Sequence, residues 1–315
     1  MIVRENEFHS RPEGLEKKNA PRVAISGVTG YVGRELAYLL ASSGSKILGL
    51  TRQGLSAIAE LPSAVTLERI ESRTEYLCEL FESFHPDVVI HLAALARRDH
   101  LVSDVSPFLE ANILLGTRLL EAMRYCGCNR FITAESVLQF SDTGESRATN
   151  LYAATKLAFA EMLKYYTAAF GISAISLVLP TLYSESETRS KLMTDVAAAL
   201  LNGSTVAIQA GEVKIDFVHV EDVARALELA LGMLEERNSE SGFFSRYWVS
   251  SGRTVTPREL VSLFERIGEK QINVQWRHSQ INSRRMTPWH GPVLPEWIPH
   301  IDLETGIRKM LSPPR

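Results

Sequence analysis

Apolar runs of strand length alternate with amphipathic segments over roughly the first 180 residues of this 315-residue chain. The apolar runs lie at residues 22–26, 46–50, 65–67, 87–92, 130–133 and 172–179. Between them, apolar positions three and four residues apart predict helices at residues 31–43, 74–84, 107–125 and 151–170. This alternation predicts an α/β fold in which helices cover both faces of a doubly wound parallel sheet.

The alternation becomes irregular after Pro180, and proline and tryptophan gather between Pro288 and Pro299. We therefore expect a main domain at residues 21–180 and, at residues 181–315, mainly a smaller lobe that closes over the sheet edge. Within that second half, a strand and a helix at about residues 213–232 are expected to return to the main sheet.

Residues 1–20 carry many charges of both signs and contain no continuous apolar run. Terminal segments of this kind are usually held loosely. We expect a flexible tail, and the alternative is a segment that covers a partner subunit.

The composition excludes several classes of protein. A net charge of −3 gives no electrostatic basis for binding nucleic acid or an anionic membrane. No apolar run reaches the roughly 18 residues that span a bilayer, and no apolar segment follows a basic start as in a secretory signal. The odd number of cysteines (Cys78, Cys126 and Cys128) predicts reduced thiols and a cytoplasmic protein. Cys126 and Cys128 lack zinc-ligand spacing, so no metal is predicted.

A glycine-rich turn joins the first predicted strand to the first predicted helix. Three glycines stand three residues apart in it: Gly27 suits a tight turn, Gly30 a close approach to a pyrophosphate, and Gly33 close packing of helix on strand. The helix then presents free N–H groups to an anion. The turn predicts a bound dinucleotide, contacted by Gly27, Thr29, Gly30, Tyr31, Val32 and Gly33.

The end of the second strand bears on the choice of dinucleotide. An acidic residue at this place binds the ribose 2′-hydroxyl of NAD, whereas arginine suits the 2′-phosphate of NADP. The sequence there is Leu50-Thr51-Arg52-Gln53, without a carboxylate. Arg52 therefore favours NADP(H), and NAD(H) stays open as the alternative.

Tyr152 and Lys156 stand four residues apart at the start of a predicted helix, and so share one face of it. A phenol titrates near pH 10, so a nearby ammonium is needed for a tyrosine to exchange protons in catalysis. Ser136 follows the 130–133 strand, at the carboxyl edge of the sheet, where its hydroxyl can polarise a substrate oxygen. These three residues are the predicted catalytic set.

These motifs together resemble the extended short-chain dehydrogenase/reductase family, in its nucleotide-sugar epimerase/dehydratase branch. The matching stretches are Gly27–Gly33, His91–Ala94, Asn112–Thr117, Tyr152–Lys156, Asp216–Val223 and Trp297–Gly306. They extend from about residue 22 almost to the end of the chain. The resemblance implies a Rossmann form of the doubly wound sheet, with a dinucleotide-binding domain at residues 21–180 and a substrate-binding lobe built from the C-terminal half.

The resemblance also implies individual roles. Ser136 is expected to donate to the substrate oxygen, Tyr152 to act as acid and base, and Lys156 to bind ribose and modulate the pKa of the tyrosine. Further cofactor contacts are expected from Tyr152, Lys156, Leu92, Ala93, Ala94, Asn112 and Pro180. Asn112 is also expected to hydrogen-bond the backbone at the sheet end.

Other residues of the matching stretches are expected to be structural. His91 is expected to pack within its strand, and Asp222 to cap its helix. Family members often dimerise through two long helices, here near residues 107–125 and 151–170, so a homodimer is expected.

Several positions on the substrate side depart from the family pattern. Ile215 stands where the family commonly has an arginine that contacts the substrate diphosphate. Lys214, Arg284 or Arg285 are the substitutes that we expect. The full predicted substrate-binding set is Ser136, Val137, Thr181, Lys214, Arg284 and Arg285. The base and the sugar of the nucleotide stay open.

The leading functional hypothesis is an NADPH-dependent ketoreductase acting on a nucleotide-linked keto-deoxysugar, with Tyr152 as the proton donor. A nucleotide-sugar 4-epimerase with bound NAD is the alternative. A 4,6-dehydratase is disfavoured because Val137 and Leu138 cannot supply the carboxyl groups that water elimination needs. A hypothesis of another class is a non-catalytic protein that senses a dinucleotide.

Overall fold

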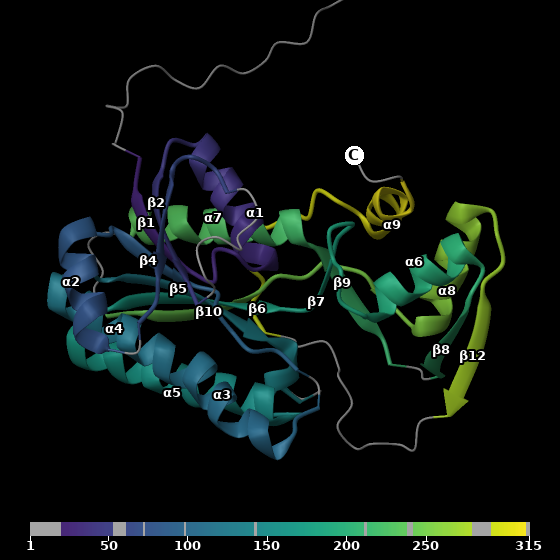
Figure 1. Ribbon diagram of the computed structural model, residues 1–315, viewed down its shortest axis with the longest axis horizontal. Coiled ribbons are helices and arrows are strands. Elements are labelled where there is room, and N and C mark those ends of the chain that lie inside the picture. The colour runs from purple at the N-terminus through teal and green to yellow at the C-terminus, as the bar shows by residue number, and fades with distance from the viewer. Residues whose placement is uncertain are drawn as a thin grey trace, which may run out of the picture.

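The computed structural model describes residues 20–52, 61–71, 73–97, 99–141, 144–210, 213–237, 242–278 and 291–312. A larger α/β part and a smaller mixed part lie side by side, as Figure 1 shows. The expected N-terminal tail lies outside the described residues except for its last position.

A seven-stranded sheet forms the centre of the larger part. Its strands in spatial order are β10 (Phe244–Trp248), β6 (Ser173–Leu179), β5 (Arg130–Ser136), β4 (Val88–His91), β1 (Arg22–Ser26), β2 (Lys46–Thr51) and β3 (Val65–Arg69). Every neighbouring pair is parallel. The predicted doubly wound parallel sheet is therefore confirmed, and its inner strands are largely apolar and buried because both faces are covered.

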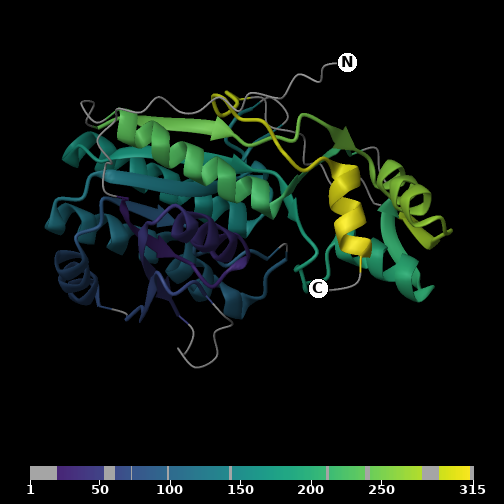
Figure 2. The same cartoon turned by 90° about the horizontal axis from the view of Figure 1, so that it is seen from above.

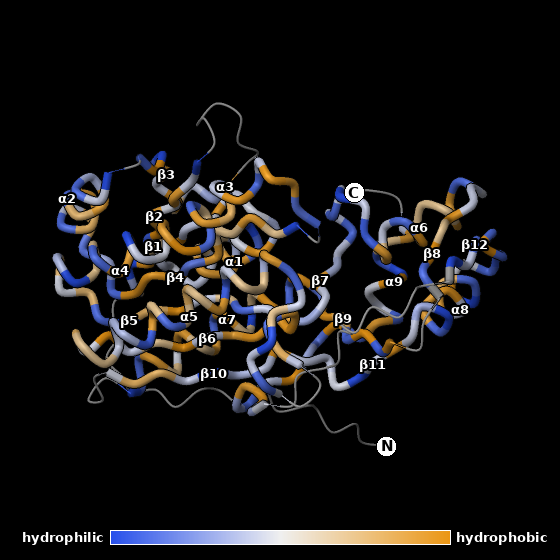
Figure 3. The backbone as a smooth tube through the Cα atoms, turned by 90° about the horizontal axis from the view of Figure 1, so that it is seen from below, coloured by the Kyte–Doolittle hydropathy of each residue, from blue (hydrophilic) through white to orange (hydrophobic). Residues whose placement is uncertain are grey.

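Two helical layers bury the two faces of this sheet. On one face lie α2 (Thr74–Phe84), α4 (Leu115–Cys126) and α5 (Leu151–Phe170), and on the other α1 (Tyr31–Ser42) and α7 (Val220–Glu236). Figure 2 shows α7 lying lengthwise over the sheet. In Figure 3 the strands of the sheet between these two helical layers run largely through hydrophobic residues.

The helix expected at residues 107–125 is interrupted. A 3-10 turn, η2 (Val102–Asp104), leads into α3 (Val105–Leu109), a π-helical segment, η3 (Glu110–Leu114), and then α4. Pro107 lies within the first turn of α3, where no intrahelical N–H bond is lost. The π segment inserts one extra residue into the turn, which changes the direction of the side chains that follow.

The described residues of the smaller part form two short sheets and three helices. The strands are β7 (Thr181–Tyr183), β9 (Ile215–His219) and β11 (Thr254–Val255) in one sheet, and β8 (Thr205–Ala210) with β12 (Asn273–His278) in the other. The helices are α6 (Leu192–Asn202), α8 (Pro257–Gly268) and α9 (Leu303–Leu311). They enclose a separate apolar core that includes Tyr183, Phe217 and Phe264.

The strand of the segment at residues 213–232 does not return to the main sheet as expected. β9 pairs with β7 and β11 instead, and only the following helix, α7, lies against β5 and β6. The strand that does return is β10, which adds in parallel beside β6. A short apolar strand can pair with any open sheet edge, so the pattern of this segment did not fix its partner.

Cys78, Cys126 and Cys128 are free thiols in the structure. Among the described residues, no helix combines the length and the apolar character needed to cross a bilayer.

Candidate active site

The glycine turn after β1 has the geometry that its sequence predicts. Gly27 has φ of +77°, and a Cβ there would lie 2.6 Å from the backbone nitrogen of Ala93. A Cβ at Gly33 would collide with the Gly27 carbonyl, and Gly30 N–H donates to that carbonyl at 2.9 Å. The turn thus packs closely against the loop that follows β4. These contacts leave room only for glycine at Gly27 and Gly33.

The start of α1 is open to an anion. Gly30 is its N-cap residue, with no side chain to cap the first N–H groups, and no acidic residue lies in the first turn. Unsatisfied N–H groups and the positive end of the helix dipole fit a pyrophosphate. Arg189 and Lys191 place their cationic groups 5.5 Å and 5.4 Å from the centre of the Tyr31 ring, and both pair with Glu187.

Arg52 is exposed directly after β2. Its neighbour Thr51 is buried, and the Thr51 hydroxyl lies 3.4 Å from that of Thr29 in the glycine turn. Arg52 is therefore at the same sheet edge as the turn. Gln53, the next residue, lies outside the described residues.

The loop after β4 is held against the glycine turn by a buried network. Leu92 N–H donates to the Ser26 carbonyl at 3.0 Å, and Ala93 N–H to the Ser26 hydroxyl at 3.5 Å. That hydroxyl lies 2.6 Å from His91 Nδ1. Burial lowers the pKa of His91 to about 3, so the ring is neutral and packs against Phe159. His91 is therefore a packed strand residue, as expected.

Asn112 projects from the π segment and is fully buried. Its Oδ1 accepts from Leu95 N–H at 2.7 Å, and its Nδ2 donates to the Leu95 carbonyl at 3.1 Å and to Thr155 Oγ1 at 2.9 Å. The expected hydrogen bonds to the backbone at the sheet end are confirmed. The bond to Thr155 also ties this loop to α5, one residue before Lys156.

Ser136 is the last residue of β5 and opens a 3-10 turn, η4 (Val137–Gln139). Its hydroxyl accepts from Leu138 N–H at 3.3 Å, and its own N–H donates to Gln139 Oε1 at 2.8 Å. This reciprocal cap fixes both the backbone and the hydroxyl of Ser136 at the carboxyl edge of the sheet.

Tyr152 and Lys156 lie in the first two turns of α5, whose N-cap Asn150 accepts from Ala153 N–H at 2.9 Å. Lys156 is 3% exposed, and burial lowers its pKa to about 8, an effect that the Glu135 carboxylate opposes. Burial raises the pKa of Tyr152 to about 12. Tyr152 thus carries its proton at neutral pH. The Lys156 side chain is mostly an ammonium at neutral pH and loses its proton as the pH rises through about 8.

Sequence reasoning missed three residues beside the predicted catalytic set. Glu135 is buried and forms a salt bridge of 3.0 Å with Arg246 of β10. Gln139 Nε2 donates to the other carboxylate oxygen of Glu135 at 2.9 Å. A glutamate inside an apolar strand was the available signal, because a buried charge requires a partner.

The predicted substrate contacts do not all lie together. Val137 packs with Phe140, Val178 and Trp248 beside Ser136. Pro180 and Thr181, both half-buried, link β6 to β7 and so join the two parts.

Lys214 is exposed on the smaller part, where its charge acts on Glu259 at the start of α8. Arg284 and Arg285 lie outside the described residues.

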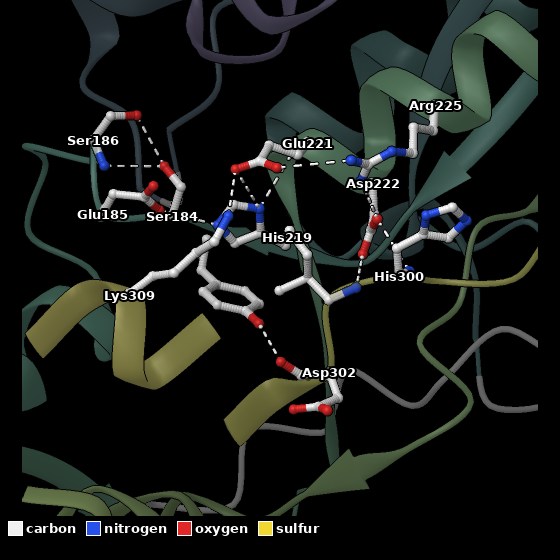
Figure 4. Close-up of polar contacts among 12 residues, drawn as sticks. Ser184, Glu185, Ser186, His219, Glu221, Asp222, Arg225, His300, Asp302 and Lys309 are labelled. Carbon is white, nitrogen blue, oxygen red and sulfur yellow. Dashed lines mark hydrogen bonds and ion pairs between the residues drawn. The ribbon is translucent and has the colours of Figure 1, made fainter. Parts of the chain in front are cut away.

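A further polar network joins the smaller part to the start of α7, and Figure 4 shows it. Glu185, His219 and Glu221 bring possible metal-ligand atoms within 4.8 Å of one another. Yet His219 Nε2 bonds Glu185 at 3.1 Å, its Nδ1 accepts from Glu221 N–H at 3.3 Å, and Lys309 Nζ lies 2.6 Å from Glu221. The hydrogen bonds and the ammonium of Lys309 account for this group of residues.

The expectation that Asp222 caps its helix is wrong. His219 is the N-cap residue of α7. Asp222 is fully buried, and its carboxylate accepts from the N–H groups of His300 and Ile301 at 3.1 Å and 2.9 Å. It therefore anchors the segment that leads into α9, a contact across 78 residues that a local pattern does not reveal.

Comparison with known proteins agrees with this geometry. The model of the NAD dependent epimerase/dehydratase family matches residues 23–241, which is more than half of the chain. The chain belongs to this family. It is accordingly an NAD(P)-dependent enzyme of the extended short-chain dehydrogenase/reductase type, and the open helix end at Gly30 suits the dinucleotide cofactor of the family.

Relatives within the family carry different activities in their names. CDP-abequose synthase of Yersinia pseudotuberculosis is 26% identical over 207 residues, which cover 65% of this chain and 71% of that one. UDP-glucuronate 4-epimerase 3 of Arabidopsis thaliana is 24% identical over 339 residues, which cover 94% and 76%.

Solved structures of family members share the fold. UDP-glucose 4-epimerase of Thermus thermophilus, in complex with NAD, has a TM-score of 0.74 at 25% identity, covering 92% of this chain and 97% of that one. UDP-glucose 4-epimerase of Thermotoga maritima has a TM-score of 0.77 at 19% identity, with the same coverage.

Proposed function

We propose that this enzyme is an NADPH-dependent ketoreductase acting on a nucleotide-linked keto-deoxysugar. When bound, the reduced cofactor supplies a hydride to the ketone carbon. Tyr152 gives its phenolic proton to the ketone oxygen, which becomes the product hydroxyl, and solvent reprotonates the tyrosine. Ser136 polarises the same oxygen by donating a hydrogen bond.

The electrostatics of the free enzyme suit proton donation by Tyr152. A pKa of about 12 keeps the phenol protonated at neutral pH, ready for the alkoxide that forms during reduction. The Lys156 ammonium is present below about pH 8 and stabilises the phenolate left after transfer. These residues complete a reduction without any further titrating group.

The observation that carries the proposal is that the neighbours of Ser136 along the chain offer no free carboxylate. The two residues after it, Val137 and Leu138, are apolar. Glu135, the residue before it, has both carboxylate oxygens bonded, one by Arg246 and the other by Gln139. A dehydratase needs a free acid and base to remove water, so this arrangement favours reduction over elimination.

Arg52 supports NADPH as the cofactor. It is exposed at the carboxyl end of β2, at the place where the ribose of a bound dinucleotide is expected. Its planar guanidinium can pair with a 2′-phosphate.

The similarity to CDP-abequose synthases and to UDP-sugar epimerases supports a nucleotide-linked sugar as the substrate.

The second candidate function is a nucleotide-sugar 4-epimerase with tightly held NAD. The observation that favours it is the likeness to UDP-glucose 4-epimerase of Thermus thermophilus in complex with NAD. Such an enzyme has no net consumption of cofactor, which separates it from a reductase in a direct assay.

We further propose that the enzyme is a homodimer paired through α3 and α5. The outer face of α5 carries an exposed apolar stripe formed by Ala154, Ala158, Met162, Tyr165 and Ala169, with the ion pair of Glu161 and Lys164 at its edge. On the neighbouring segment, Val105 and Leu109 are also exposed. Apolar residues at this spacing on two adjacent helices fit a second copy of the same face.

The deciding experiment follows absorbance of the reduced nicotinamide with a panel of nucleotide-linked 4-keto-6-deoxysugars and plain hexose nucleotides. Stoichiometric oxidation of NADPH with a keto-sugar is the expected result. Interconversion of two plain hexose nucleotides without added cofactor and without net absorbance change would replace the reductase by the epimerase.

A further inference from the structure

We propose that Glu135, Arg246 and Gln139 form a positioning network that holds Ser136 and Lys156 in their working arrangement. The inference concerns how the proposed catalytic set is held, and so rests on the proposed function for its catalytic meaning. None of the three residues is expected to contact the substrate.

Glu135 is held from two sides. Both the Nε and a terminal nitrogen of Arg246 lie 3.0 Å from Oε1, and Gln139 Nε2 lies 2.9 Å from Oε2. The Glu135 side chain is 2% exposed and that of Arg246 19%. The Arg246 guanidinium also stacks 5.3 Å from the ring centres of Phe140 and Phe244, which fixes its plane.

Gln139 connects the fixed Glu135 carboxylate to the backbone of Ser136. Its Nε2 is committed to Glu135 and its Oε1 accepts the Ser136 N–H at 2.8 Å, so the amide has one orientation that satisfies both ends. The chain Arg246–Glu135–Gln139–Ser136 therefore runs from an edge strand to the last residue of β5. A change at Arg246 acts on Ser136 through two intermediate side chains.

Glu135 also faces Lys156. On β5 it follows Phe131 and Thr133 on alternate positions, and Phe131 belongs to the core beneath α4 and α5. The carboxylate favours the ammonium form of Lys156 against the effect of burial. The other groups around Lys156 are neutral His91 of β4 and protonated Tyr152 of its own helix, so Glu135 is the anion that supports this ammonium among the described residues.

A contribution to stability alone is a weak explanation for the Glu135–Arg246 pair. Removing the Glu135 carboxylate and most of the Arg246 side chain from water costs free energy of hydration, and well-packed apolar residues often replace such pairs without loss of stability. The presence of a charged pair beside Ser136 and Lys156 is explained when its charge and its hydrogen bonds serve the site.

The test compares three variants by two measurements. Glu135→Gln removes the charge, Glu135→Gln with Arg246→Met removes the pair, and Gln139→Met removes the bond to Ser136 without changing charge. The first measurement is a ¹³C NMR titration of the Lys156 side chain in free enzyme labelled at lysine, with the signal assigned by its loss in Lys156→Met. The second is the pH profile of kcat/KM.

We expect Glu135→Gln to lower the Lys156 pKa by about one unit and kcat/KM by about tenfold, because an opposite charge and a charge-assisted hydrogen bond are lost. The double variant should fold like wild type, keep a lowered Lys156 pKa and stay slow. Gln139→Met should be slow with an unshifted Lys156 pKa.

Two results overturn the proposal. One is a Lys156 pKa in Glu135→Gln that equals the wild-type value. If Glu135→Gln does not fold, the Lys156 pKa of the double variant is compared with wild type instead. The other is a double variant with wild-type kcat/KM, which would make the pair structural only.

The NMR titration uses no substrate, so its outcome is independent of the proposed reaction. If wild type interconverts hexose nucleotides instead of consuming NADPH, the proposed function fails in that assay alone. The pH profile is then recorded on the interconversion.

Discussion

The side-chain amide of Asn112 donates to the hydroxyl of Thr155 across 2.9 Å, joining the π segment to α5 one residue before Lys156. The same amide group holds Leu95 by both of its backbone groups. Asn112 lies in the π segment and is fully buried, so its amide meets Leu95 and Thr155 away from solvent. The helix interruption and the placement of Lys156 are therefore parts of one arrangement.

The first prediction follows from these bonds to Leu95 and Thr155. Asn112→Ala removes the bonds to both Leu95 backbone groups and to the Thr155 hydroxyl, which keeps only its bond to the Tyr152 carbonyl. We expect kcat/KM to fall about tenfold and cofactor affinity to weaken several-fold, because three hydrogen bonds that order this loop are lost. Steady-state kinetics and fluorescence titration of the cofactor measure both. Unchanged values for both would show that the loop is held by other contacts.

The second prediction concerns Tyr152. Tyr152→Phe removes the proton donor but keeps the ring, so turnover should fall by about 10²–10⁴-fold while the dissociation constant of the cofactor stays within a few-fold. Kinetics beside fluorescence titration give the comparison. Near-normal kcat in the variant would remove Tyr152 from the mechanism.

The third prediction is the pH dependence of kcat/KM. Burial lowers the pKa of Lys156 to about 8, so its ammonium is present below that pH and is lost as the pH rises through it. We expect kcat/KM to decline above about pH 8, whereas Tyr152, with a pKa of about 12, stays protonated throughout this range. Lys156→Arg keeps a cation at higher pH. Its rate should be lower but without the decline seen in wild type, and a decline at the same pH would assign the titration to another group.

The fourth prediction concerns the choice of cofactor. Arg52→Ala should weaken NADPH binding by about 1.5–3 kcal/mol, the size of a hydrogen bond to a charged group. NADH binding serves as the internal control, because it lacks the 2′-phosphate. Calorimetry with both cofactors provides the measurement, and equal losses would show that Arg52 does not distinguish them.

The fifth prediction concerns assembly. Met162 is 43% exposed in the apolar stripe of α5, so Met162→Glu places a charge in the proposed dimer interface. Light scattering after size-exclusion chromatography should give a dimer for wild type and a monomer for the variant. Leu201→Glu, at a 55% exposed position on α6, is the matched control and should stay dimeric. A monomeric wild type would contradict the proposal.

Part of the site could be predicted because its determinants are local in sequence. The turn requires a positive φ at Gly27 and close contact of Gly33 with the Gly27 carbonyl, and the four-residue spacing of Tyr152 and Lys156 fixes their common helix face. The apolar runs indicated strands because both sheet faces are buried, and that property is visible in each run by itself.

The tertiary structure alone decided which distant residues meet. Glu135 pairs with Arg246 across 111 residues, and Asp222 holds the backbone of Ile301 across 79. A local pattern states that a carboxylate is present but not which partner the packed chain brings to it. Strand order has the same origin, since an apolar strand such as β10 pairs with whichever edge its connections and packing place beside it. The sequence by itself thus determined most elements of the larger part, the cofactor turn and the face shared by Tyr152 and Lys156, while long-range packing determined the network around them.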